Sequence, residues 1–301
     1  MKFIIAFVTQ PRFIKENIQT WVTFADKLSS KLNVSKSDIK ISYFVWDNIT
    51  SSKTRTEFGN EYSTKIDQQE VTDAVSLSWH EYDSVNLDFI SYDEVLPSHP
   101  QTKIFLEELG ITMPDVYKHF IRSWPQFIIR KIASDNLAQS DPEAWCFMTR
   151  TDYYLNPQDE FWKHLTVLTK PKLVSTFNDN VIETFYLSYT GIENRPEFGC
   201  WVNDQILLSK SKNFGKLYDD QMAEIFVSAY KSYHNSDGLV QGFEKSMGVP
   251  PHQVTPWFTK NKDLTLVNTI PFTLLAGDLV RYYDGDKPMF SQMKRSPLTG
   301  N

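Results

Sequence analysis

The sequence is poor in cysteine and has no excess of positive charge. Its 301 residues include two cysteines, Cys146 and Cys200, and no Cys/His spacing typical of a zinc site. A disulfide framework is therefore excluded, and we expect both thiols to be small apolar groups in strands of a protein in a reducing compartment. The formal net charge is −6. Since a duplex binder needs a basic face to displace counterions, this charge argues against nucleic acid as a partner.

Long apolar runs are also missing. No stretch reaches the roughly 18 apolar residues of a membrane helix. The apolar run Phe3–Val8 near the N-terminus is shorter than the core of a secretory signal, and no small-residue cleavage site follows it. We therefore expect a chain without a transmembrane segment in the cytoplasm.

The composition is that of an ordinary globular protein, with 41% hydrophobic and 23% charged residues. We find no linker or internal repeat and predict a single domain over residues 1–301. Residues 51–95 are polar and are expected to form an insertion. Residues 250–301, rich in proline and turn residues, are expected to wrap the domain. Aromatic residues make up 14% of the chain, which fits stacking on sugars or bases but equally a large core.

Alternating strand and helix patterns predict an α/β fold. Four segments and one pair of segments read as buried strands, and a short strand is expected near Thr265–Val267. The four are Phe3–Thr9, Ile39–Trp46, Ala144–Arg150 and Lys172–Thr176, and the pair lies around Cys200–Leu208. Helical spacing is found over residues 14–28, 102–137 with breaks at Gly110, Pro114 and Pro125, 211–233 and 236–249. The first strand, helix and strand predict a right-handed parallel crossover.

Polar residues follow three of the predicted strands. They are Gln10 and Arg12 after the first strand, Trp46 and Asp47 at the end of the second, and Arg150 and Asp152 at the end of a later one. Ligands of such sheets bind outside the carboxyl ends of the strands, so these groups are expected to share one site. In a strand, Arg150 and Asp152 would point the same way. A structural ion pair is the alternative for these two, and a strand simply ending in an aromatic and a turn residue is the alternative for Trp46 and Asp47.

The chemistry of these groups suits a nucleotide diphosphate carrying a group to be transferred. Arginine forks match phosphate oxygens, and Asp152 could hold a divalent cation or a sugar hydroxyl. Lys131 shares the inward face of its helix with Phe127 and Ile128. An inward lysine indicates either a phosphate or carboxylate partner or a side chain that covers apolar surface with its stem.

Together these residues resemble the GT-A-type glycosyltransferases of polysaccharide and lipopolysaccharide gene sets and of large viruses. The resemblance rests on "FVTQPRF" and "SYFVWDN", on a helix with Ser123, Gln126 and Lys131, on "TRTD", and on Asn203-Asp204-Gln205; it spans about residues 3–250. It implies a single GT-A-like, Rossmann-like domain with a mixed, mostly parallel central sheet flanked by helices. It further implies transfer of a sugar from a nucleotide-sugar donor to a glycan or other hydroxyl acceptor, in polysaccharide biosynthesis.

The resemblance also assigns roles to single residues. Gln10, Arg12, Trp46, Asp47, Lys131, Arg150 and Asp152 would bind the donor. Asp152 would hold Mn²⁺ or Mg²⁺, although Arg150 stands where the commoner Asp-x-Asp motif has its first aspartate. Gln10 and Pro11 also depart from the small residues usual after the first strand.

An inverting enzyme needs a general base, for which Asp204 is the candidate and Glu244 the reserve. Asp204 could equally be a turn residue between strands, and a retaining enzyme would need no base there. Two other functions stay open: a non-catalytic module that binds nucleotide sugars or glycans, and a sugar nucleotidyltransferase. The absence of a glycine-rich loop after the first strand counts against the latter.

Overall fold

The computed structural model describes residues 1–11, 14–52, 61–116, 123–151, 159–168, 181–186, 203–235, 258–259 and 262–271. The strands are β1 (Phe3–Thr9), β2 (Ile39–Trp46), β3 (Asn48–Ser52), β4 (Glu61–Lys65), β5 (Val85–Ile90), β6 (Trp145–Thr149), β7 (Val181–Tyr186), β8 (Asn203–Lys210) and β9 (Thr265–Pro271). The helices are α1 (Ile14–Leu32), α2 (Gln68–Ser78), α3 (Tyr92–Ser98), α4 (Pro100–Leu109), α5 (Met113–Asp115), α6 (Trp124–Ser140), α7 (Asp159–Leu168), α9 (Ser211–Leu217) and α10 (Met222–Asn235), with a 3-10 turn, η1, at Lys36–Asp38. Of these helices, none is both long and apolar enough to cross a bilayer.

A seven-stranded sheet in the order β5-β2-β1-β6-β8-β7-β9 forms the centre of the described part of the chain. Strands β5, β2, β1 and β6 are mutually parallel. Strand β8 pairs antiparallel with both β6 and β7, and β7 is parallel to β9. The predicted α/β class with a mixed, mostly parallel sheet is thereby confirmed. Strands β3 and β4 form a separate antiparallel pair.

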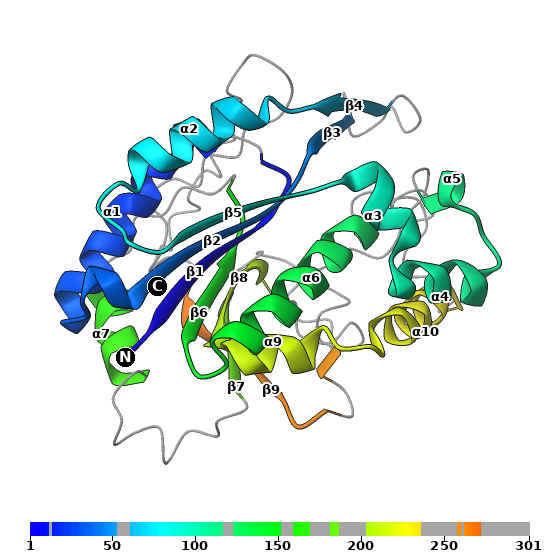
Figure 1. Ribbon diagram of the computed structural model, residues 1–301. Coiled ribbons are helices and arrows are strands. Elements are labelled where there is room, and N and C mark those ends of the chain that lie inside the picture. Colours follow the sequence, from blue (N-terminus) through cyan, green and yellow to red (C-terminus); the bar gives the residue numbers. More distant parts are fainter. Residues whose placement is uncertain are drawn as a thin grey trace, which may run out of the picture.

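Helices cover both faces of the central sheet, as Figure 1 shows. Alternate residues of β1 face opposite ways: Phe3, Ile5 and Phe7 pack toward α1, α2 and α7. Ile4, Ala6 and Val8 pack toward the core shared with α3, α4, α6, α9 and α10. A strand buried on both faces is apolar at most consecutive positions, which explains why β1 and β2 could be predicted with their observed bounds.

Helix α1 follows β1 because its apolar residues recur at helical spacing. Ile14, Ile18, Trp21, Ala25 and Leu28 are each at most 6% exposed and form one stripe against the sheet. The Trp21 ring meets Phe7 edge-on at 5.0 Å between centroids. This contact ties α1 to the strand that precedes it.

The other predicted segments were placed with mixed outcomes. The predicted breaks of the region 102–137 are confirmed, since α4 ends at Gly110 in a left-handed conformation (φ 62°) and Pro125 lies in the first turn of α6. The short strand near Thr265 is present as β9. The segment 51–95, expected as an insertion, supplies the edge strand β5. Residues 172–176 and 236–249 lie outside the described residues.

Candidate functional site

The carboxyl ends of β1, β2 and β6 lie at one edge of the sheet, which we call the carboxyl edge. These three strands are parallel neighbours, with Thr9 opposite Val45 and Phe7 opposite Thr149. Gln10, Asp47 and Arg150, which directly follow the three strands, are therefore brought to the same edge, as predicted from their positions.

The turn after β6 is fastened to its neighbours by hydrogen bonds that the sequence did not predict. The Thr151 hydroxyl donates to the Gln10 carbonyl oxygen at 3.2 Å. The side-chain amide of Asn17, in the first turn of α1, donates to the Thr151 carbonyl oxygen at 3.0 Å. Thr151 and Asn17 are only 2% and 3% exposed. The turn that contains Arg150 is thus tied to both the loop after β1 and the start of α1.

Strand β6 ends at Thr149, one residue before Arg150, and Thr151 lies in a turn. The two-residue period of a strand therefore does not extend to the Arg-x-Asp segment. Asp152 lies outside the described residues, so the common direction of Arg150 and Asp152 stays a prediction.

Asp47 connects β2 to its surroundings through backbone and side chain. Its N–H donates to the Ile90 carbonyl at 2.9 Å, and its carbonyl accepts from the Ile66 N–H at 3.1 Å. The carboxylate accepts from the Tyr92 N–H at 2.9 Å, at the first residue of α3. A carboxylate at a helix N-terminus satisfies an otherwise unpaired N–H and complements the helix dipole. Asp47 thus fixes the position of α3 beside the carboxyl edge.

Trp46 is a core residue, which corrects the expectation that its indole contacts the donor. The side chain is 1% exposed and packs edge-on against Tyr92 with 5.2 Å between ring centroids. Alternate side chains of β2 face opposite sides of the sheet, and Trp46 lies on the same side as Phe44, in the core shared with α6. For Trp46 the alternative, a strand that simply ends in an aromatic residue, is the observed one.

Lys131 has its anionic partners within the chain. Its ammonium donates to both carboxylate oxygens of Asp135, at 2.9 and 2.8 Å, and lies 3.0 Å from Asp220 Oδ1 in the turn between α9 and α10. Burial alone would lower the pKa of Lys131, but the hydrogen bonds to the two carboxylates outweigh it and raise that pKa. Among the described residues, its bonds lead to α6 and the α9–α10 turn; contact with a donor stays a prediction.

The candidate bases are placed only in part. Asp204 lies in β8, and the antiparallel register sets Leu207 opposite Met148. The amino end of β8, with Asp204, therefore lies beside the carboxyl end of β6; for Asp204 the structure describes the backbone alone. Arg12 and Glu244, like Asp152, lie outside the described residues.

Metal binding by Asp152 is not decided by the described residues. Among them, no group of three or more His, Cys, Asp and Glu side chains is arranged to hold a metal ion. The cation expected at Asp152 stays a proposal.

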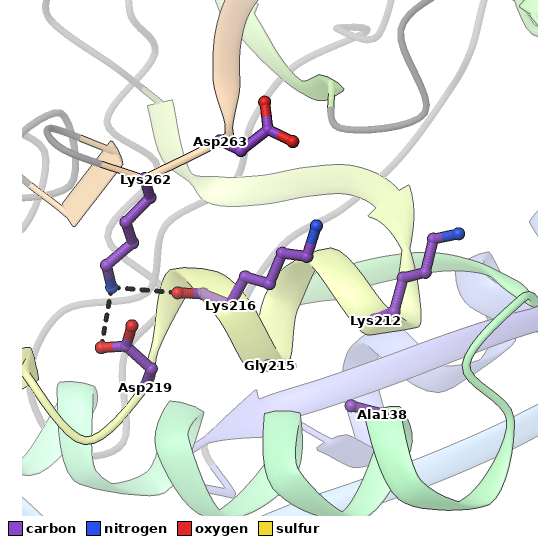
Figure 2. A pocket seen from close by; sticks show the side chains of 7 residues that line it. All are labelled: Ala138, Lys212, Gly215, Lys216, Asp219, Lys262 and Asp263. Atoms are coloured by element: carbon purple, nitrogen blue, oxygen red, sulfur yellow. Dashed lines mark hydrogen bonds and ion pairs between the residues drawn. The ribbon is translucent and has the colours of Figure 1, made fainter.

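An open depression of about 520 Å³ lies along α9, beside the C-terminal part of α6 (Figure 2). Its lining residues are Ala138, Lys212, Gly215, Lys216, Asp219, Lys262 and Asp263. Helix α9 starts directly after Lys210, which is opposite Trp145 at the amino end of β6. Lys262 donates to the Lys216 and Leu217 carbonyls at 2.9 and 3.0 Å and pairs with Asp219 at 2.8 Å. Its ammonium therefore closes the C-terminus of α9. None of the residues that line the depression is one of those predicted for the donor site.

Comparisons with known proteins were made for the sequence and for the fold. No protein-family model and no curated protein sequence matches. The fold is similar to the galactosyltransferase LgtC in complex with donor and acceptor sugar analogs, with a TM-score of 0.41 and 10% identity over 85% of this chain and 70% of that one. Mouse xyloside xylosyltransferase 1 gives a TM-score of 0.38 at 10% identity over 88% and 83% of the two chains. The glycosyltransferase GlyE of Streptococcus pneumoniae gives 0.34 at 10% identity over 89% and 45%.

Proposed function

We propose that this protein is a glycosyltransferase that moves a sugar from a nucleotide-sugar donor to a hydroxyl of a glycan or other acceptor. The observation that supports the proposal most is the meeting of three parallel strand ends with the amino end of β8. Gln10, Asp47, Arg150 and Asp204 come from four strands that are far apart in sequence. Such convergence at the carboxyl edge of an α/β sheet is typical of a nucleotide site.

A sugar transfer needs positive charge beside its leaving group. When the bond between the anomeric carbon and the donor phosphate breaks, the electron pair leaves with the diphosphate, whose negative charge grows. In our proposal Arg12 and Arg150 face that diphosphate, because a guanidinium offers two parallel N–H donors to phosphate oxygens. Asp47, beside α3, is proposed to approach the base or ribose.

The acceptor hydroxyl must lose a proton as its oxygen bonds to the anomeric carbon. For an inverting transfer, Asp204 is proposed to take this proton, with Glu244 as the second choice. Asp152 is proposed to bind Mn²⁺ or Mg²⁺, which would neutralise phosphate charge, or else a sugar hydroxyl.

A thermal-shift screen tests the proposal directly. Purified protein is melted with UDP-, GDP-, CMP- and dTDP-sugars, each with and without Mn²⁺, and with the matching free sugars as controls. A ligand that binds the folded state raises the melting temperature by mass action. A shift with one nucleotide sugar, followed by its transfer or hydrolysis, supports the proposal. Binding without turnover leads to the non-catalytic module, and no shift with any nucleotide sugar contradicts nucleotide-sugar binding.

A further inference from the structure

Asn17 is a polar residue on the otherwise apolar face of α1. It lies one turn from Ile14 and Trp21, both of which pack on the sheet, and it is 3% exposed. A buried amide is costly unless it is hydrogen-bonded, so the position calls for a specific partner.

That partner is the turn after β6. The Asn17 amide reaches the Thr151 carbonyl, 134 residues away in sequence, at 3.0 Å. Thr151 in turn donates to the Gln10 carbonyl. Thr151 directly follows Arg150, the cationic residue that the structure places at the carboxyl edge. A shift of the Thr151 backbone would therefore move Arg150.

We infer that Asn17 is a positioning residue, which sets the turn at Arg150 and Thr151 against Gln10 and thereby orients the Arg150 side chain toward the donor. This inference rests on the proposed function. Side chains that stabilise a developing charge act only in the correct geometry, and a misplacement of about 1 Å can reduce the rate by about a hundredfold. Asn17 acts through the backbone of Thr151 and touches no substrate itself.

The alternative is a purely structural amide, and the chain offers a matched example. Gln101, in α4, is also 3% exposed, and its amide bonds the Asp220 carbonyl at 2.7 Å and the Ala223 N–H at 2.8 Å. It fastens the α9–α10 turn as Asn17 fastens the turn after β6. Gln101 therefore serves as the control for the loss of one buried amide.

The experiment compares Asn17→Ala with Gln101→Ala. For both we measure melting temperature, kcat and KM for the donor found in the screen, and deuterium uptake of the peptide that contains Arg150 and Thr151. We expect both variants to melt earlier. In Asn17→Ala alone, kcat should fall about 10- to 100-fold with a smaller change in KM, and this peptide should exchange faster. Thr151→Val, which removes the hydroxyl bond to Gln10, should change both quantities in the same direction, and it replaces Asn17→Ala if that variant does not fold.

The outcomes separate this inference from the proposed function. Equal effects of Asn17→Ala and Gln101→Ala on kcat, or unchanged uptake of the Arg150–Thr151 peptide, would overturn the positioning role. If the wild type transfers no sugar, the proposed function fails, and the uptake data still decide whether Asn17 holds this turn.

Discussion

The Lys131 ammonium, on a side chain that is 8% exposed, lies 3.0 Å from the carboxylate of Asp220, whose side chain is 93% exposed. One end of the ion pair is therefore buried and the other is in water. Asp135, also largely exposed, holds the same ammonium from one turn further along α6. A buried ammonium without an anionic partner is costly, so the folded protein needs at least one of these two carboxylates beside Lys131.

Because of this asymmetry, the losses in the free energy of unfolding caused by substituting Asp135 and Asp220 should not add. Asp135→Asn and Asp220→Asn should each lower the free energy of unfolding by about 1 kcal/mol or less, because the other carboxylate remains. The double variant should lose about 3 kcal/mol, since it leaves the ammonium buried without an anion. Urea denaturation at neutral pH measures all three. Glu143→Gln, which removes an exposed carboxylate shared by Lys210 and Lys212, is the control and should cost little.

Lys131→Met tests the donor contact predicted from the sequence. Because every bond of Lys131 to the described residues goes to a carboxylate of the chain, we expect the donor KM to stay unchanged in a variant that still folds. A several-fold increase in that KM, at a temperature at which the variant is folded, would support the predicted contact of Lys131 with the donor.

His99 lies between α3 and α4, and its protonation should lower the free energy of unfolding in mild acid. Its Nδ1 accepts from the Gln101 N–H at 3.2 Å and thereby caps α4, a role that requires the neutral ring. Burial, and then the charge of Lys131, lower the pKa of His99 below its ordinary 6.5, although Asp135 and Asp220 act in the opposite direction. A lowered folded pKa means that this contribution is present above 6.5 and is lost as the pH falls through the folded pKa.

His99→Asn keeps a capping side chain that does not titrate in this range. Between pH 7.5 and 5, the free energy of unfolding of the wild type should fall more steeply than that of the variant. The measurement is urea denaturation at each pH, and parallel curves for the two proteins would contradict the assignment.

The sequence was sufficient to predict the strands that are buried on both faces and are therefore mostly apolar. Strands β1 and β2 were predicted with their observed bounds because both faces are covered by helices. Strand β5 was missed, since it lies at the sheet edge and exposes Asn86 and Asp88 between half-buried residues. A short alternating segment in a polar region looks like surface structure, and only its pairing with β2 makes it part of the sheet.

The candidate site divides in the same way. Strand ends could be read from the sequence, because parallel neighbours finish at a common edge. Asn17 can be noticed in the sequence as a polar residue on the apolar face of a helix, but its bond to Thr151 depends on how α1 packs. Likewise, Asp135 follows Lys131 at helical spacing and could have been proposed as its partner, whereas Asp220 comes from a distant turn.

Tyr43 and Trp79 form a buried hydrogen-bonded pair, and removing the acceptor of this bond should be costly because it leaves the donor buried and unpaired. The Trp79 indole N–H donates to the Tyr43 hydroxyl at 2.8 Å, and both side chains are at most 2% exposed. Tyr43→Phe leaves that N–H buried without an acceptor and should cost about 2 kcal/mol. Tyr82→Phe is the control, because Asp26 loses the Tyr82 hydroxyl but keeps Lys36 at 2.7 Å and access to water. Thermal unfolding should show the larger loss for Tyr43→Phe, and equal losses would refute the argument.

Asp152→Ala tests the proposed role of Asp152 in transfer most directly. If Asp152 holds the cation or a sugar hydroxyl opposite Arg150, its removal takes away an interaction needed as charge develops on the leaving group. We expect the rate of transfer to fall by about a thousandfold or to vanish, with an unchanged melting temperature in the absence of ligand. The same variant should lose the Mn²⁺-dependent part of the thermal shift with the donor.

Asp159→Ala is the matched control, because this carboxylate at the start of α7 is 78% exposed and pairs only loosely with Lys31, at 3.7 Å. Normal turnover in Asp152→Ala would remove this residue from the site and leave the Arg-x-Asp segment with a structural role.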